Sequence, residues 1–361
     1  MNDEYYMEHA LKLARKGRGF VSPNPLVGAV IVKNGRIIGQ GYHRRYGEPH
    51  AEINAIRNAA TDLNGTTLYI NLEPCCHSGK TPPCVDSIIE HKIGRVIIGA
   101  TDSNPLVSGR GIAILRNHGI EVKTGVMENE CRAINEVFFY YMEKGLPFVT
   151  LKYAQTLDGR IAAKTGQSQW ISSEASLKFS HRLRAEHDAI LVGSGTVSKD
   201  NPELTVRLVR GRNPLRVILS SDLRIPAEAK ILHNLSDAPT LIATLKKSSD
   251  KKFQQLISLG AEVISVAADK SGKVDLKSLL KILAGRKISS VLLEGGAGII
   301  TSAFRDNIAN RLVTIIAPKI IGKGIEAVGD LNIEKLASAK ILVIKTIKRS
   351  GTDIIIDGRM E

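Results

Sequence analysis

The sequence is poor in aromatic side chains and in long apolar runs. Only 4% of its 361 residues are aromatic, with a single tryptophan, so it offers few platforms on which unpaired nucleic-acid bases could stack. No apolar run approaches the roughly 20 residues that cross a bilayer, and residues 1–6 lack the basic-then-apolar plan of a secretory signal. We therefore expect neither nucleic acid nor a membrane as a partner.

Cysteine is also scarce. Four cysteines in a chain of this length do not make the dense disulfide framework of small secreted proteins. Two of them belong to the motif described below, and Cys76 and Cys131 show no pairing pattern. We therefore expect a reducing, cytoplasmic location.

A net charge of +14 at pH 7 is the strongest bias in the composition. Such a charge can mark a nucleic-acid binder or a protein that attracts phosphorylated substrates. The basic residues occur in scattered pairs, such as Arg44-Arg45 and Lys246-Lys247, with no long run. This distribution favours an ordinary solvated basic surface first and an anionic small-molecule substrate second.

The most informative motif is His50-Ala51-Glu52, followed by Pro74-Cys75 and then by Cys84. One imidazole and two thiolates make a three-ligand zinc set, which leaves the fourth position open for water. Zinc lowers the pKa of bound water toward neutrality, and Glu52 can then carry protons. The pattern is typical of zinc-dependent nucleobase deaminases, although eight residues separate the two cysteines here and two in the common pattern.

Two alternatives to a catalytic zinc site are a structural zinc site and no metal at all, since free cysteine is often an inert core residue. The local sequence favours the catalytic site. A helix follows Glu52, a strand over 66–72 leads to Cys75, and Pro82-Pro83 precedes a helix that begins at Cys84.

The length and the pattern of elements predict two α/β domains, 1–146 and 147–361. In the first we expect strands at 27–32 and 37–41 around an Asn34-Gly35 hairpin turn, and a closing helix at 131–144 before Gly145. Its other expected elements are helices at 3–16, 53–56, 84–90 and 112–118 and strands at 66–72 and 95–100. The second domain is expected to hold a helix at 174–186 and strands at 148–155, 160–163, 189–192, 216–219, 240–244, 262–266 and 291–294, with antiparallel edge strands at 312–317, 341–348 and 353–357.

Four segments of the first half, in order, resemble the deaminase domain of the bifunctional riboflavin-biosynthesis deaminase/reductases. They are 22–29 (SPNPLVGA), 50–52 (HAE), 73–84 (EPCCHSGKTPPC) and 102–105 (DSNP). The long spacer between the cysteines matches that branch. Four segments of the second half resemble the partner reductase: 151–162, 168–172, 195–207 and 294–298. The resemblance covers nearly the whole chain.

The resemblance implies a cytidine-deaminase-like α/β/α domain followed by a dihydrofolate-reductase-like α/β domain. The first would hydrolytically deaminate 2,5-diamino-6-(5-phosphoribosylamino)pyrimidin-4-one, and the second would reduce the ribosyl chain to ribityl phosphate with NADPH. It also implies one Zn²⁺ per chain, a phosphorylated pyrimidine as the small-molecule substrate, and a homo-oligomer formed through the reductase domain.

In the deaminase the resemblance assigns zinc to His50, Cys75 and Cys84 and proton transfer to Glu52. Five polar residues are expected at the substrate: Asn24, His43, His77, Lys80 and Asn104. Asn24 can hydrogen-bond a sugar or ring edge, and His77 and Lys80 suit the 5′-phosphate. The alternative is that all five are exposed loop residues without a role.

The reductase half has no Gly-X-Gly-X-X-Gly after its first strand, so a Rossmann site is not expected. Instead, the glycine cluster 295–298 follows an apolar strand and opens a helix, where backbone N–H groups can face a pyrophosphate. By resemblance, the NADPH contacts are Ala154, Trp170, Thr196, Asp200, Ser221, Gly296, Ala297, Gly298, Ile299, Ile300, Thr301 and Ser302. Trp170 could equally be a core residue, and Ser220-Ser221 departs from the aspartate of many relatives.

By the same resemblance, Lys152 is the catalytic residue of the reductase. The expected substrate residues are Ser168, Arg184, Leu204, Arg207 and Glu294. Arg184 and Arg207 are the natural phosphate clamps, since guanidinium binds phosphate oxygens bidentately. We expect Lys152 and Glu294 at the ends of apolar strands, where ligand-facing groups gather in open α/β sheets.

Two rival functions remain at this stage. A tRNA adenosine deaminase would share the first fold and fit the basic charge, but it leaves the second half unexplained. A catalytically silent binding protein would have no need of an intact His-Ala-Glu and both cysteines.

Overall fold

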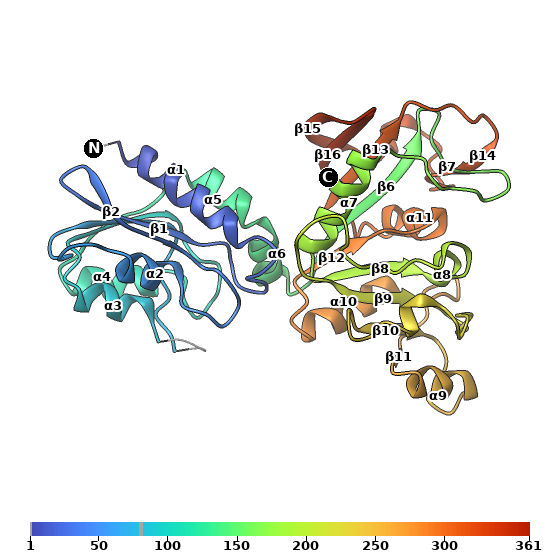
Figure 1. Cartoon of the computed structure of the whole chain (residues 1–361), viewed down its shortest axis with the longest axis horizontal. Coiled ribbons are helices and arrows are strands. Elements are labelled where there is room, and N and C mark those ends of the chain that lie inside the picture. The colour runs from blue at the N-terminus through green and yellow to red at the C-terminus, as the bar shows by residue number, and fades with distance from the viewer. Residues whose placement is uncertain (1, 79–81) are drawn as a thin grey trace. The chain divides into compact units, whose positions relative to one another are not determined.

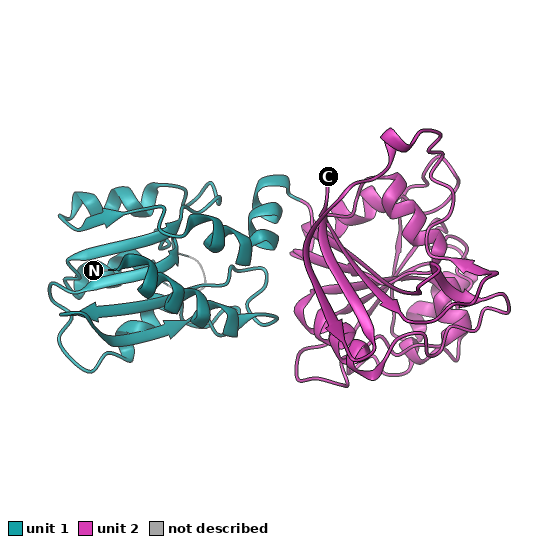
Figure 2. Cartoon of the chain, turned by 90° about the horizontal axis from the view of Figure 1, so that it is seen from above, with its two compact units in different colours: residues 1–145 teal, residues 146–361 magenta. Residues whose placement is uncertain are grey.

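The chain folds into two compact units, Met1–Gly145 and Leu146–Glu361 (Figure 2). The structure is a computed structural model that describes residues 2–78 and 82–361. Lys80 therefore lies outside the described residues. Within the described ranges, no helix is both long and apolar enough to cross a bilayer.

Unit 1 is built on a five-stranded sheet with the order β2-β1-β3-β4-β5 (Figure 1). Its strands are β1 (Gly28–Lys33), β2 (Arg36–Tyr42), β3 (Thr67–Leu72), β4 (Arg95–Ala100) and β5 (Glu121–Lys123). The β1–β2 hairpin turns at Asn34 and Gly35, whose φ angles are 51° and 75°. Both are positive, as a type I′ turn requires, and the predicted hairpin is confirmed.

Helices cover both faces of this sheet. They are α1 (Asp3–Ala14), α2 (Ala51–Arg57), α3 (Cys84–Glu90), α4 (Arg110–Asn117), α5 (Glu128–Ile134) and α6 (Glu136–Lys144), with a 3₁₀ turn at Arg15–Gly17. Successive strand residues point to opposite faces, so Ile31 packs in the core under α2, α3 and α4, while Val30 packs in the core under α1, α5 and α6. The α/β/α layers expected from the sequence are confirmed.

The single closing helix expected at 131–144 is wrong, because α5 and α6 are separate helices that meet at Asn135. The buried Asn135 side chain accepts a hydrogen bond from the Leu26 N–H at 2.7 Å and donates one to the Leu26 carbonyl at 2.9 Å. A bond to a residue 109 positions away in the sequence holds the break. No local pattern predicts it.

Unit 2 contains a nine-stranded sheet with the order β11-β10-β9-β8-β12-β6-β13-β16-β15. Its strands are β6 (Phe148–Thr156), β8 (Ala189–Gly193), β9 (Leu215–Leu219), β10 (Thr240–Thr244), β11 (Glu262–Ser265), β12 (Ser290–Leu293), β13 (Arg311–Ala317), β15 (Leu342–Ser350) and β16 (Asp353–Met360). Pairing is parallel from β11 to β13 and antiparallel for the last two strands at the edge. The antiparallel strands expected at 341–348 and 353–357 are confirmed, whereas the strand expected with them at 312–317 lies inside the sheet, where it pairs parallel with β6. The separate strands β7 (Arg160–Ala163) and β14 (Gly324–Glu326) pair with each other.

The nine-stranded sheet is also covered on both faces. Its helices are α7 (Glu174–Glu186), α8 (Ser194–Asp200), α9 (Lys251–Ser258), α10 (Leu276–Gly285) and α11 (Ala297–Arg305), with 3₁₀ turns at Lys230–Leu232 and Leu336–Ser338. α10 and α11 pack on one face with Leu191 and Val217, whereas α7, α8 and α9 pack on the other with neighbours such as Ile190 and Ile218. The parallel strands are buried on both faces, which is why they read as continuous apolar runs in the sequence.

Candidate functional site

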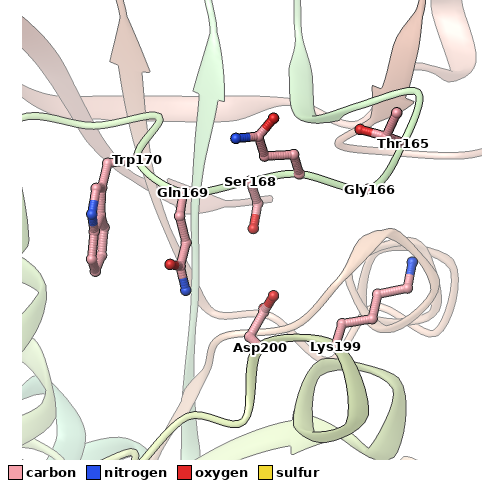
Figure 3. Close-up of a pocket in the computed structure, with 8 residues that line it drawn as sticks. Thr165, Gly166, Ser168, Gln169, Trp170, Lys199 and Asp200 are labelled. Carbon is pink, nitrogen blue, oxygen red and sulfur yellow. The ribbon is translucent and has the colours of Figure 1, made fainter.

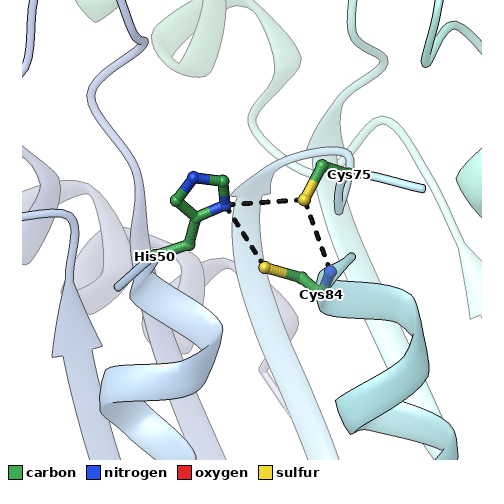
Figure 4. A group of neighbouring side chains, drawn as sticks. All are labelled: His50, Cys75 and Cys84. Carbon is green, nitrogen blue, oxygen red and sulfur yellow. Dashed lines mark hydrogen bonds between the residues drawn. The ribbon is translucent and has the colours of Figure 1, made fainter. Parts of the chain in front are cut away.

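The three predicted zinc ligands meet in unit 1 (Figure 4). The Nδ1 atom of His50 lies 3.5 Å from the Cys75 Sγ and 3.3 Å from the Cys84 Sγ. All three ligand atoms lie within 4.8 Å of one another. Cys76, next in the chain, is not part of the group, and its thiol donates to the carbonyl of Leu106.

These distances fit a tetrahedral zinc ion. Bonds of about 2.3 Å to sulfur and about 2.0 Å to nitrogen separate neighbouring ligand atoms by roughly 3.5–3.8 Å. Because the described residues offer three donor atoms here, the fourth position is left for water, as in catalytic rather than structural sites.

The ligands stand at the ends of three elements. His50 caps the N-terminus of α2, Cys75 follows the end of β3, and Cys84 is the first residue of α3. The Cys84 N–H donates to the Cys75 sulfur at 3.3 Å, an arrangement that favours a thiolate. The connections that lead into the N-termini of α2 and α3 therefore bring the ligands together.

Two glycines of β2 allow α2 to lie close enough to present His50. A Cβ on Gly41 would lie 2.4 Å from the Ala55 nitrogen, and one on Gly39 would lie 2.6 Å from the Ala55 carbonyl oxygen. Both contacts are to helix backbone, which cannot turn away as a side chain can. Only glycine fits at this crossing.

We expect Gly41→Ala to lower zinc occupancy and deamination together, because α2 must move and carry His50 with it. Overpacking of this kind costs about 1–3 kcal/mol of stability. Gly285→Ala is the matched control, since a Cβ there meets nothing within 4 Å. Metal content and ammonia release measured on both variants check the prediction, and a fully zinc-loaded, active Gly41→Ala would contradict it.

Glu52 lies two residues after the ligand His50, in the first turn of α2. Its side chain is 3% exposed, and its Oε2 has no hydrogen-bond partner among the described residues. Burial, together with the nearby Cys75, raises the pKa of Glu52 to about 7. A buried carboxyl group with an unsatisfied oxygen is unfavourable unless a ligand or water completes it.

The two thiols interact strongly. Their mutual hydrogen bond lowers the pKa of Cys75 and raises the pKa of Cys84. One thiol therefore already has thiolate character, and the charge of a bound cation would favour thiolate at both, since the thiolate is the metal-binding form.

Asn24 and His43 lie beside the ligands. The Asn24 amide donates to the His43 Nε2 at 3.2 Å, and the His43 ring stacks edge-on against the ring of His50 with centroids 5.1 Å apart. Burial and the neighbouring His50 lower the pKa of His43 to about 4. The structure thus brings together two residues that the sequence placed 19 positions apart.

His77 and Asn104 differ in their surroundings. The Nδ1 of His77 is buried without a described partner, so it is available to a ligand. Asn104 forms a turn, since its N–H donates to Asp102 and its side-chain oxygen accepts from the Leu106 N–H. Its side chain thus already has a structural role.

Sequence reasoning missed two buried carboxyl groups next to this site. Glu73 accepts hydrogen bonds from the backbone N–H groups of Asp102, Gly109 and Ile112, and burial raises the pKa of Asp102 to about 6. Glu73 therefore holds the loop after β4 beside the cysteine loop. The position of Glu73 immediately before Pro74-Cys75 was the one sequence feature that could have indicated its role.

In unit 2, Lys152, Arg184 and Glu294 form a partly buried charged cluster. Arg184 grips Glu294 through two hydrogen bonds, from Nη2 at 2.7 Å and from Nε at 3.3 Å. Burial alone would raise the pKa of Glu294, but Arg184 and Lys152 outweigh it and lower the value to about 2. Burial lowers the pKa of Lys152, and Glu294 partly offsets this.

Two expectations for this region need correction, and a third stays a prediction. Lys152 lies inside β6 rather than at its end, because the strand continues to Thr156, whereas Glu294 does follow the end of β12. The guanidinium groups of Arg184 and Arg207 each pair with a glutamate, Glu294 and Glu203, and their role as phosphate clamps stays a prediction. The side chain of Leu204 is 3% exposed and packs in the core, so only its backbone can line a site.

A hollow of about 800 Å³ gathers several of the expected ligand residues (Figure 3). It is lined by Thr165, Gly166, Gln167, Ser168, Gln169, Trp170, Lys199 and Asp200. Trp170 is 65% exposed, so the alternative that it is a core residue is wrong. An exposed indole at the rim of a polar hollow suits a flat ligand.

The glycine cluster opens α11 as expected, with Gly296 as its N-cap. A Cβ on Gly296 would lie 3.9 Å from the Thr196 hydroxyl, so two expected cofactor residues from different elements are neighbours. Thr301 uses its hydroxyl within the protein, donating to the Ala297 carbonyl, and Ile300 is a core residue. The Ser221 hydroxyl accepts from the Val274 N–H.

Comparisons with known proteins match both halves. The RibD C-terminal domain family matches residues 147–356, and the cytidine and deoxycytidylate deaminase zinc-binding region matches residues 1–100. A riboflavin biosynthesis protein RibD of Aquifex aeolicus is 45% identical over 355 residues, which cover 98% of this chain and 97% of the relative.

Several solved structures resemble the whole chain. A diaminohydroxyphosphoribosylaminopyrimidine deaminase/5-amino-6-(5-phosphoribosylamino)uracil reductase of Thermotoga maritima has 40% identity and a TM-score of 0.87, with 99% of each chain covered. RibD of Acinetobacter baumannii has 33% identity and a TM-score of 0.91, again with 99% of each chain covered. The resemblance noted in the sequence is confirmed. The chain belongs to the RibD family of riboflavin biosynthesis, whose members combine a zinc-dependent deaminase with an NADPH-dependent reductase.

Proposed function

We propose that residues 1–146 carry the deaminase and residues 147–361 the reductase, acting in turn on one phosphorylated pyrimidine. The observation that supports this most directly is the His50, Cys75 and Cys84 group with the unsatisfied Glu52 oxygen beside it. The substrate would be 2,5-diamino-6-(5-phosphoribosylamino)pyrimidin-4-one, in keeping with the name of the similar Thermotoga maritima enzyme.

In the deaminase, His50, Cys75 and Cys84 would hold zinc. Zinc, when bound, supplies an activated water for attack on the carbon that carries the amino group. Glu52 would take one proton from the water at Oε2 and give it to the ring nitrogen, and would then carry a second proton from the new hydroxyl group to the departing ammonia.

The remaining polar residues would orient the substrate. Asn24 and His43 lie beside His50 and suit the sugar or ring edge, while His77 and Lys80 suit the phosphate. Asn104 would contribute through the turn that it forms. The unpartnered Nδ1 of His77 supports its part in this assignment.

In the reductase, NADPH supplies the hydride, and the chain's own residues hold the two ligands. Trp170, Thr196, Asp200 and the N-terminus of α11 would hold the cofactor, with Ala154 and Ser221 as further contacts. Ser168, Arg207 and Glu294 would hold the substrate, and Lys152 would give a proton to the opening sugar. Arg184 would keep Glu294 ionised and in place.

The test is to incubate the diamino substrate with the zinc-loaded protein, with and without NADPH, and to identify the products by mass. Without NADPH we expect only the product in which oxygen replaces the amino nitrogen. With NADPH we expect that product to gain two hydrogens. Ammonia release from RNA, but not from the free nucleotide, would overturn the proposal.

A separate expectation concerns the division of labour. Residues 1–146 expressed alone should fold, bind zinc and deaminate without any nicotinamide cofactor, since a chain of this length is an ordinary domain and the core on each face of its sheet lies within it. The readouts are circular dichroism, zinc content and ammonia release. A soluble, zinc-bound but inactive fragment would mean that the pocket borrows residues from unit 2.

We also propose that the chain forms a homo-oligomer through the reductase. β15 is a nine-residue edge strand, and Ile344 and Ile347 on it are 50% and 64% exposed. A long edge strand with exposed apolar side chains is a ready site for another copy to pair. Sedimentation of the wild type and of Ile347→Lys tests this, with a shift toward the monomer expected in the variant.

For location, we propose the cytoplasm. All four cysteines are free in the structure, and the proposed zinc ligands Cys75 and Cys84 must stay reduced to bind metal. A reducing compartment provides that condition.

A further inference from the structure

A segment of unit 2, residues 203–207, has no regular secondary structure, yet side chains hold its backbone at nearly every residue. Arg216 donates to the carbonyl of Glu203 at 3.2 Å, and Arg184 donates to that of Thr205 at 3.4 Å. The Val206 N–H donates to the Asn213 side chain at 2.7 Å, and the Arg207 N–H donates to the Nδ1 of His181 at 3.0 Å. This segment carries Arg207, and we call it the arginine arm.

The hydrogen bond that His181 accepts is the last of these contacts along the segment, and its donor is the backbone N–H of Arg207 itself. His181 is 6% exposed and comes from α7, one helical turn before Arg184. One face of α7 therefore supports the arginine arm through His181 and grips Glu294 through Arg184. The Arg207 guanidinium is about half exposed and faces its neighbours Glu203 and Thr205.

We propose that His181 is a positioning residue of the reductase. It fixes the position of the Arg207 side chain by accepting a hydrogen bond from the Arg207 backbone N–H. The proposal rests on the proposed function, in which Arg207 binds the anionic group of the substrate. Side chains that fix a substrate-binding residue act by preorganisation, and small displacements of such residues have large effects.

The protonation state of His181 agrees with this role. An accepting Nδ1 must carry no proton, so the ring is neutral with its proton on Nε2. Burial lowers the pKa of His181 to about 4, helped by the positive charges of Arg184 and Arg207 and opposed by Glu294. Lys152 adds a further positive charge. At neutral pH the acceptor form is therefore the populated one.

The experiment compares His181→Leu, His181→Asn and a control in the full-length, zinc-loaded chain, using NADPH oxidation with the deaminated substrate. We expect His181→Leu to raise the substrate KM about ten-fold, equivalent to about 1.4 kcal/mol, with kcat and the KM for NADPH changed less than two-fold. Asparagine places a carbonyl oxygen near the position of Nδ1, so His181→Asn should recover most of the affinity.

The matched control is His187→Leu. His187 is a second buried histidine close to α7, and it bonds to Leu183 and Thr150 but not to the arginine arm. The His187→Leu variant should have a lower melting temperature without a selective rise in the substrate KM. Ammonia release by the same preparations and their melting temperatures report whether each variant is folded.

Three outcomes would overturn the inference: an unchanged KM in His181→Leu, equal rises in KM in both leucine variants, or no recovery in His181→Asn. Arg207→Ala separates this from a failure of the proposed function. If Arg207→Ala leaves the substrate KM unchanged, the assignment of Arg207 is wrong. If it raises KM and His181→Leu does not, only the role of His181 is wrong. A nitrogen NMR spectrum that shows the Nδ1 of His181 protonated at neutral pH would also overturn the inference.

Discussion

Glu52→Gln is expected to keep its zinc and to lose deamination by about 10²–10⁴-fold, the usual contribution of a general acid/base group. The amide has the size and shape of the carboxyl group, so the first turn of α2 and the His50 ligand should stay in place. It cannot take up and release a proton in the working pH range. The measurement is ammonia release under saturating substrate, together with zinc content per chain.

Glu48→Gln provides the matched control, because this exposed acidic residue lies just before Pro49 and His50 and has no part in the proposed site. It should deaminate like the wild type. Reduction of pre-deaminated substrate by Glu52→Gln should also be unchanged. A zinc-loaded Glu52→Gln with near-normal ammonia release would remove Glu52 from the mechanism.

The zinc site could be predicted from the sequence because each ligand is fixed by its immediate neighbours. His50 caps the start of a helix, Cys75 lies three residues after an apolar strand, and Cys84 follows two prolines. The local signals that start and stop elements are sufficient to bring these residues to one end of a sheet. The Asn34-Gly35 hairpin was predictable for the same reason, since its turn type depends on the two residues themselves.

The residues that were misplaced depend on distant partners. The bond between Arg184 and Glu294 joins positions 110 residues apart, and the break at Asn135 depends on Leu26. Lys152 was expected at a strand end because its apolar run stops there, but β6 continues with half-buried residues. The hydrophobic periodicity of a segment indicates which face of one helix or strand is buried. It does not indicate which charged side chains from other elements contact that helix or strand.

The role of His43 shows the same limit. Its neighbours in sequence, Tyr42 and Arg44, give no reason to expect a neutral, buried ring. The structure supplies one, because the ring lies between Asn24 and His50 and accepts a hydrogen bond from the first. The family resemblance pointed to His43 as a substrate residue, but the physical reason for its neutral, buried ring lies in partners that are distant in the sequence.

Lys152→Met is expected to lower kcat for reduction by about 10²–10⁴-fold while leaving deamination unchanged. Methionine fills the space of the lysine stem, and Glu294 keeps its two hydrogen bonds from Arg184, so the charged cluster does not collapse. What is lost is the one group in the cluster that can give up a proton readily. Burial lowers the pKa of Lys152, whereas Glu294, with a pKa of about 2, is ionised and has no proton to donate at neutral pH.

NADPH oxidation with the deaminated substrate, titrated in both ligands, distinguishes this role from simple binding. Lys152→Met should change kcat far more than either KM, whereas Arg207→Ala should raise the KM of the substrate through the loss of charge-assisted bonds worth about 1.5–3 kcal/mol each. Lys178→Met is the control, because this exposed lysine of α7 pairs only with Glu174 among the described ion pairs. If Lys152→Met instead raises the substrate KM at an unchanged kcat, its ammonium binds an anionic group, and the proton for the opening sugar must come from water.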